Sequence, residues 1–177
     1  MRYLFIALLT STTLFSANLT FSNGFVEAQT SIFGDSNINP SSSNIVSYLS
    51  MDKGDVTTLK GTVDVSLVDL KSDNGDRDEH MHKVIDSEKY TTTTFTINSV
   101  VKNSEGSYTI HGKLNLHGIS RELNLLGVLQ EHDNSLRIKA KTSFNMSAFG
   151  IEPPTLLFLK VRDRLQMTIN TTYTIEP

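Results

Sequence analysis

The chain has 177 residues, a formal net charge of −3 and no cysteine. This charge is too small to predict nucleic acid or an anionic membrane as a partner, and no basic block interleaved with aromatic residues occurs. The absence of cysteine excludes a thiol nucleophile, a cysteine-based zinc site and disulfides. The fold must therefore rest on its hydrophobic core.

The N-terminal 28 residues are predicted to be a secretory signal peptide. Met1-Arg2 is a short basic start, and residues 3–17 are mostly apolar and uncharged. Val26-Glu27-Ala28 then offers small or branched residues at the positions that a signal peptidase reads. Cleavage after Ala28 is favoured, and an earlier cut near Ala17 is the alternative.

A membrane anchor is the competing interpretation of this segment, but Thr and Ser interrupt its apolar run well before a span of ~20 residues. We therefore expect a secreted protein, periplasmic if its source is a Gram-negative bacterium. Residues 29–177 are expected to form one domain.

After a polar, extended lead-in over residues 29–42, apolar and polar residues alternate along most of the chain. The alternation predicts strands over residues 44–50, 59–70, 92–102, 107–117, 121–131, 135–146 and 162–175. A period of two is typical of antiparallel strands with one buried, apolar face and one solvent-exposed, polar face. Such strands curl most economically into a barrel, because closure removes exposed edges. The predicted fold class is all-β, an antiparallel barrel of about seven to eight strands.

One short helix is expected between the second and third of these strands. Residues 71–78 are dense in turn formers, and Asp78 is a plausible N-cap for a helix over 79–85. Met81, Val84 and Ile85 fall at spacings of three and four, which is typical of one helix face.

Three segments resemble the YceI-like family of secreted, lipocalin-like proteins. The first is the Arg-Asp-x-His element at residues 77–80, with its helix and the start of the following strand from Tyr90 to Phe95. The second is the Gly-x-Leu-x-Leu-x-Gly hairpin over residues 112–127. The third is a Phe-Gly-Ile element before the last strand, within residues 144–169. The resemblance covers roughly residues 59–175. It implies a lipocalin-like barrel with a helix packed beside it. It also implies an internal apolar tunnel, which in some members holds a polyisoprenoid or another long-chain amphiphile.

The densest ionisable cluster spans residues 76–82. Its functional interpretation is a metal site at His80 and His82, or acid–base chemistry by His80 and Asp78. Helix positions two apart project about 200° from each other, so the two histidines should diverge. A capped helix start is therefore favoured, and the resemblance implies that Arg77, Asp78 and His80 form a structural corner that closes the barrel.

The other histidines, His111, His117 and His132, are expected at solvated positions. No Gly-x-Ser-x-Gly elbow and no phosphate-binding glycine loop occurs in the sequence. Nothing assembles a nucleophile, a base and an orienting acid, so we expect neither an enzyme nor a cofactor.

The apolar stripes are the candidate ligand-binding residues. A barrel of about eight strands is just wide enough to be filled by its own side chains or to enclose one slender ligand. Burying a chain of about fifteen carbons would contribute on the order of 10 kcal/mol, against association costs of at least ~4 kcal/mol. The predicted lining comprises Val63, Val65, Leu67, Phe95, Ile97, Ile110, Leu114, Leu116, Leu123, Leu125, Ile138, Ala140, Phe144, Leu156, Phe158, Leu165, Met167 and Ile169. The run Leu156–Leu159 is equally interpreted as a lid or as a segment that packs across one barrel end.

The leading hypothesis is a secreted protein that binds a long-chain lipid or isoprenoid inside its barrel, without stable membrane insertion after signal removal. The alternative is a packed, ligand-free barrel that serves as a structural, interaction or stress-related module. A metal-dependent or enzymatic function rests only on His80, His82 and the nearby acids. The sequence leaves a homodimer open.

Overall fold

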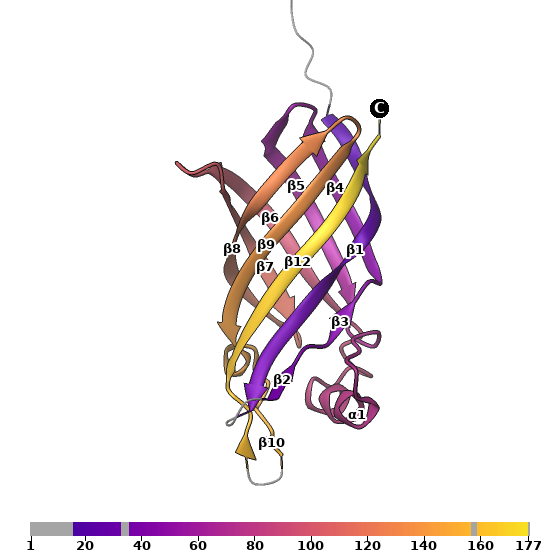
Figure 1. Ribbon diagram of the computed structural model, residues 1–177, viewed down its shortest axis with the longest axis vertical. Coiled ribbons are helices and arrows are strands. Elements are labelled where there is room, and N and C mark those ends of the chain that lie inside the picture. Colours follow the sequence, from indigo (N-terminus) through magenta and orange to yellow (C-terminus); the bar gives the residue numbers. More distant parts are fainter. Residues whose placement is uncertain (1–15, 33–35, 157–158, 177) are drawn as a thin grey trace, which may run out of the picture.

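Eight long strands close into an antiparallel barrel in the computed structural model, which describes residues 16–32, 36–156 and 159–176 (Figure 1). Around the barrel they follow the order β1 (Ser16–Ile32), β4 (Ile45–Asp52), β5 (Asp55–Ser66), β6 (Thr92–Lys102), β7 (Tyr108–Leu116), β8 (Ile119–His132), β9 (Ser135–Asn145) and β12 (Arg164–Ile175). Antiparallel pairing of β12 with β1 closes the sheet. This confirms the predicted all-β barrel.

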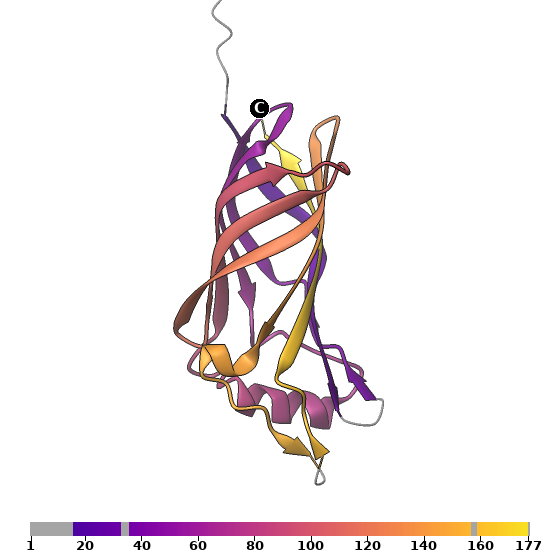
Figure 2. The ribbon, with the colours of Figure 1, turned by 90° about the vertical axis from the view of Figure 1, so that its left-hand side faces the viewer.

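The remaining elements gather toward one end of the barrel, which we call the helix end (Figure 2). They are α1 (Gly75–Val84), the short 3-10 helix η1 (Met146–Phe149) and the hairpin of β10 (Thr155–Leu156) with β11 (Leu159–Lys160). The short strands β2 (Ser36–Ile38) and β3 (Ser41–Ser42) pair with β1. The C-terminal residues lie at the opposite end.

β1 pairs with barrel strands from Ser16 to Gln29, and its last three residues pair with β2. Ala17 pairs with Met51 on one side, and Val26 pairs with Ile169 on the other. The strand bulges between Phe21 and Asn23. The nearby Gly24 has a φ of +132°, which favours glycine, and a Cβ there would lie only 2.2 Å from the carbonyl oxygen of Asn170.

Residues 16–28, which the sequence assigned to the signal peptide, thus form part of a barrel strand in the structure. Residues 1–15 of the predicted signal peptide lie outside the described residues, and the signal peptide stays a prediction. A cut after Ala28 would remove most of β1, but a cut near Ala17 would leave it almost intact.

α1 starts four residues earlier than predicted. Asn74 is the N-cap, and its side chain accepts a hydrogen bond of 3.0 Å from the backbone N–H of Arg77. Asp78, the predicted cap, lies inside the helix, and its carboxylate accepts hydrogen bonds from the backbone N–H and the hydroxyl of Ser72. Both residue types suit an N-cap, and the loop geometry selects the earlier one.

Among the residues that the structure describes, no helix is long and apolar enough to cross a bilayer.

The strand faces follow the predicted alternation. In β9, the side chains of Leu136, Ile138 and Ala140 are buried, whereas the intervening Arg137 and Lys139 are exposed. The end opposite α1 is filled by part of one cluster of buried side chains, and we call this part the packed half: Ala17, Leu19, Met51, Leu59, Val100, Leu129, Leu136 and Ile175.

Candidate ligand-binding cavity

Two adjoining cavities lie in the barrel interior, beyond the packed half. The helix-end cavity has a volume of about 140 Å³, and the mid-barrel cavity has a volume of about 70 Å³. Five residues line both of them and mark the boundary between the two chambers: Val26, Val65, Thr93, Leu114 and Met167. The cavities therefore succeed one another along the barrel, from α1 toward the packed half.

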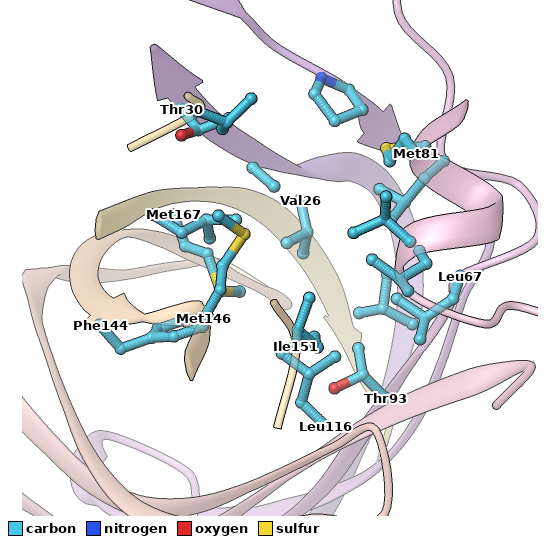
Figure 3. A pocket seen from close by; sticks show the side chains of 18 of the residues that line it. Val26, Thr30, Leu67, Met81, Thr93, Leu116, Phe144, Met146, Ile151 and Met167 are labelled. Carbon is cyan, nitrogen blue, oxygen red and sulfur yellow. The ribbon is translucent and has the colours of Figure 1, made fainter. Parts of the chain in front are cut away.

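α1 contributes one apolar face to the helix-end cavity. Met81, Val84 and Ile85 line it, because residues three and four apart lie on the same side of a helix. Figure 3 shows Met81 and Leu67 on one side of the cavity, with Phe144 and Met167 on the other. The wall is thus assembled from strands on both sides of the barrel and from the helix beside it.

Few polar side chains reach these walls. Thr93 donates its hydroxyl hydrogen bond to the carbonyl oxygen of Asn115 at 2.7 Å, so this group is satisfied within the sheet. His80 lines the helix-end cavity, and its Nε2 atom is buried without a hydrogen-bond partner among the described residues. The interior therefore favours apolar chemistry over polar recognition.

Most of the predicted lining residues face a cavity. The helix-end cavity is lined by Leu67, Leu116, Phe144 and Leu165; the mid-barrel cavity by Val63, Phe95, Ile97, Ile110, Leu123, Leu125, Ile138 and Ile169; both by Val65, Leu114 and Met167. Whether these side chains contact a ligand stays a prediction.

Three predicted residues do not belong to this set. Ala140 is 2 % exposed and packs opposite Gly127, so its short side chain lines neither cavity. The side chain of Leu156 and the whole of Phe158 lie outside the described residues, and with them the question of whether Leu156–Leu159 is a lid.

Sequence reasoning missed one group of wall residues in β1 and another around η1. Val26, Ala28 and Thr30 line the helix-end cavity, and their spacing of two is the strand signal that the signal-peptide interpretation obscured. Met146 and Ile151 come from η1 and the loop after it, where no simple period operates.

The expected corner residues separate into two roles. Arg77 and His80 lie at the cavity wall, whereas Asp78 is bonded to Ser72 beside the helix start. His82 points elsewhere, because its Nδ1 atom lies 3.1 Å from the Ser87 hydroxyl.

The remaining histidines are spread over the outside of the barrel. His111 contacts Asn124, and His132 is exposed beside Asp133. His117 differs from the solvated position expected for it: it is half-buried, its ring centroid lies 4.4 Å from that of Tyr90, and its Nδ1 atom lies 3.2 Å from the carbonyl oxygen of Phe149. Within the described ranges, no group of three or more potential metal ligands comes together.

Comparison with known proteins gives curated relatives that match part of the chain. UPF0312 proteins of Shewanella oneidensis and Vibrio cholerae are 30% and 32% identical to the chain over 111 residues, which cover 58% of the chain in each case and 58% and 59% of those proteins. A UPF0312 protein of Vibrio vulnificus is 31% identical over 78 residues, 43% of the chain and 41% of that protein. These alignments thus span about half the length of the curated relatives.

Solved structures resemble the whole barrel. BcnA of Burkholderia cenocepacia superposes with a TM-score of 0.74 at 12% identity, covering 84% of this chain and 95% of that one. A polyisoprenoid binding domain from Saccharophagus degradans superposes with a TM-score of 0.67 at 12% identity, covering 92% and 99%. The Campylobacter jejuni YCEI protein gives 0.69 at 17% identity, covering 82% and 88%.

The model of the YceI-like domain matches residues 16–173, from the first residue of β1 into the last barrel strand. The match includes the segments that carried the resemblance in the sequence, and it takes in β1 as the structure describes it. The chain therefore belongs to the YceI-like domain family.

Proposed function

We propose that this barrel binds one apolar or amphiphilic lipid, with an apolar part of the ligand in the helix-end and mid-barrel cavities. The observation that carries the proposal is the pair of adjoining cavities with almost entirely apolar walls. Pockets of this kind are typical of small-molecule sites. The fold shared with a polyisoprenoid binding domain supports an isoprenoid or another long-chain lipid as the ligand.

The size of the interior limits how much ligand it holds. A dry apolar cavity of ~150 Å³ accommodates a molecule of about the size of benzene, and the helix-end cavity has about 140 Å³. We infer that one end of the ligand occupies the two cavities and that the rest of a long chain leaves at the helix end. Met81, Met146 and Met167 in the wall can adapt to different chain shapes, because methionine is unbranched and flexible.

The packed half limits the end of the barrel from which a ligand can enter. Met51 and Leu136 are fully buried there, so a chain that enters the barrel meets close-packed side chains beyond the mid-barrel cavity. We infer that the ligand enters and leaves at the helix end, past α1.

We also propose that the protein acts by binding rather than by catalysis, outside the cytoplasm. His80 and His82 have different surroundings, and His80 has no carboxylate bonded to it among the described residues. The basic, apolar N-terminal sequence supports export.

Organic extraction of the protein purified from its native host, followed by mass spectrometry, tests the binding proposal. We expect about one lipid per barrel. Delipidated and refolded protein should then take up the identified lipid with the same stoichiometry. Absence of lipid from several preparations, together with no saturable uptake of palmitate or farnesol, would contradict the proposal and favour a ligand-free module.

A further inference from the structure

The outer face of β9 presents a row of cations. Arg137, Lys139 and Lys141 alternate with the buried residues of the strand, and all three are exposed. Side chains two apart on a strand point to the same face, so these charges lie along one line on the barrel wall.

No neighbouring strand supplies a compensating charge to this row. On β8, the residues opposite the three cations are Gln130, Val128 and Leu126, and on β12 they are Thr172, Asn170 and Thr168. Among the described residues, none of the three cations takes part in a salt bridge.

Acidic residues elsewhere on the wall are distant or already paired. Glu122 on β8 lies 3.6 Å from the Lys113 ammonium nitrogen. Glu27 lies opposite Thr168, two strands from Lys141 and therefore on the order of 10 Å away. A chain with net charge −3 thus carries a locally uncompensated positive strip.

Exposed apolar side chains lie directly beside these cations. Leu126 is 59 % exposed opposite Lys141, and Val128 is 42 % exposed opposite Lys139. We call the surface formed by Leu126, Val128, Arg137, Lys139 and Lys141 the β8–β9 face; its strands run side by side in Figure 1.

The opposite wall offers an internal comparison. Val46 and Tyr48 on β4 are also exposed, but their partners on β5 are Asp64 and Thr62. Apolar exposure occurs on both walls, whereas its combination with an uncompensated row of cations belongs to the β8–β9 face.

We propose that the β8–β9 face binds the surface of a lipid bilayer rich in anionic headgroups, with the barrel lying on its side wall. Cations near an anionic surface are attracted to the headgroups, and apolar side chains among them enter the interfacial layer. An acidic protein would match the charges but would give Leu126 and Val128 no apolar partner. This inference goes beyond ligand binding and does not depend on it.

Co-sedimentation of the full chain with vesicles tests the inference. We expect binding to vesicles of phosphatidylglycerol and phosphatidylcholine in equal parts, little binding to phosphatidylcholine alone, and weakening with salt. The triple substitution Arg137→Gln, Lys139→Gln, Lys141→Gln should weaken binding by about fivefold per cation, about a hundredfold in all.

The matched control removes three exposed cations elsewhere, Lys60→Gln, Lys71→Gln and Lys83→Gln, and therefore changes the net charge equally. We expect at most a few-fold weakening. For the apolar contribution, Leu126→Ser with Val128→Thr should weaken binding, whereas Tyr48→Ser with Val46→Thr should not. Thermal unfolding of each variant verifies that the barrel is intact.

Equal weakening by the two triple substitutions would overturn the proposal, because it would mean that overall charge alone acts. Equal binding to both kinds of vesicle, or to neither, would overturn it as well. Binding to poly-L-glutamate as tight as to the anionic vesicles, with no effect of the Leu126 and Val128 substitutions, would assign the face to an acidic protein instead.

Discussion

The packed half and the cavity-bearing half of this barrel are made by the same strands. In β9, Leu136 is fully buried in the packed half, whereas Ile138, one inward position further along, lines the mid-barrel cavity. The packed half includes the paired ends of β1, β4 and β12, which close the cylinder. The half near α1 is bounded instead by a helix, a 3-10 helix and loops.

The difference indicates that stability and binding are divided along the barrel axis. Close-packed side chains contribute the dispersion and burial that stabilise the sheet. Side chains that border a cavity lack contacts on one side, and that empty side is what a ligand can fill. Substitutions in the two halves should therefore have different consequences.

The largest expected effect comes from removing β1. A chain that starts at Gln29 lacks Ala17, Leu19 and Val26, and leaves β4 and β12 with unpaired edges. We expect no soluble, folded protein, whereas a chain that starts at Asn18 should fold. Circular dichroism and the soluble fraction measure the difference.

The same role of β1 can be tested on the exported protein. We expect N-terminal sequencing of the secreted protein to begin near Asn18. A mature, folded protein that begins at Gln29 would contradict the structural role assigned to β1.

Leucine-to-alanine substitutions should next distinguish the two halves. Leu136→Ala leaves a cavity in close-packed surroundings, and we expect a loss of about 4 kcal/mol in the free energy of unfolding. Leu116→Ala enlarges an existing cavity and should cost about 2 kcal/mol or less. Urea denaturation monitored by tyrosine fluorescence measures both, and equal losses would mean that the cavity half is as well packed as the other.

Filling the cavities should affect binding more than stability. Met167→Trp places a large ring at the boundary between the two cavities, and Ile138→Trp places one in the mid-barrel cavity. We expect each to abolish lipid uptake at a cost of about 1–3 kcal/mol in stability. Gln166→Trp, on the outward face of the same strand as Met167, is the control. Normal lipid uptake by both filled variants would place the ligand elsewhere.

Weakening the start of α1 should have a smaller, local effect. Asn74→Ala removes the N-cap hydrogen bond to Arg77, and we expect a loss of about 1 kcal/mol in helix stability. Because α1 forms a cavity wall, the ligand should also dissociate faster. Hydrogen exchange of the helix amides and a stopped-flow release assay measure the two effects; faster exchange in β9 as well would show that the effect is not local.

Ionisation of the Tyr173 hydroxyl should not affect the stability of the protein at neutral pH, but it should lower the stability at alkaline pH. Burial raises the pKa of the Tyr173 hydroxyl above the ordinary value, because the charged form is desolvated. Its contribution to stability is therefore complete below about pH 10, the pKa in the unfolded chain, and is lost as the pH rises through the higher folded pKa. Ultraviolet titration of the wild type and of Tyr173→Phe should show one late-titrating tyrosine that the variant lacks.

Alternation by itself predicted seven barrel strands and which residues of each point inward. It missed β1, because an apolar, uncharged N-terminal run followed by Val26-Glu27-Ala28 also matches a signal peptide. It placed the start of α1 too late, because Asn74 and Asp78 are both good capping residues and only the bonds to Ser72 separate their roles.

The sequence alone also did not predict the role proposed for the outward-facing charges. The sequence places Arg137, Lys139 and Lys141 on one face, but net charge alone argued against an anionic membrane as a partner. Only the strand register reveals that their neighbours on β8 and β12 are uncharged.

The period of two is enough to predict the barrel and to sort the side chains into inward and outward sets. It does not predict which inward side chains fill the barrel and which surround a cavity. The reason is physical: inward orientation depends on neighbours along one strand, whereas packing depends on how closely residues from opposite walls approach at each level of the barrel.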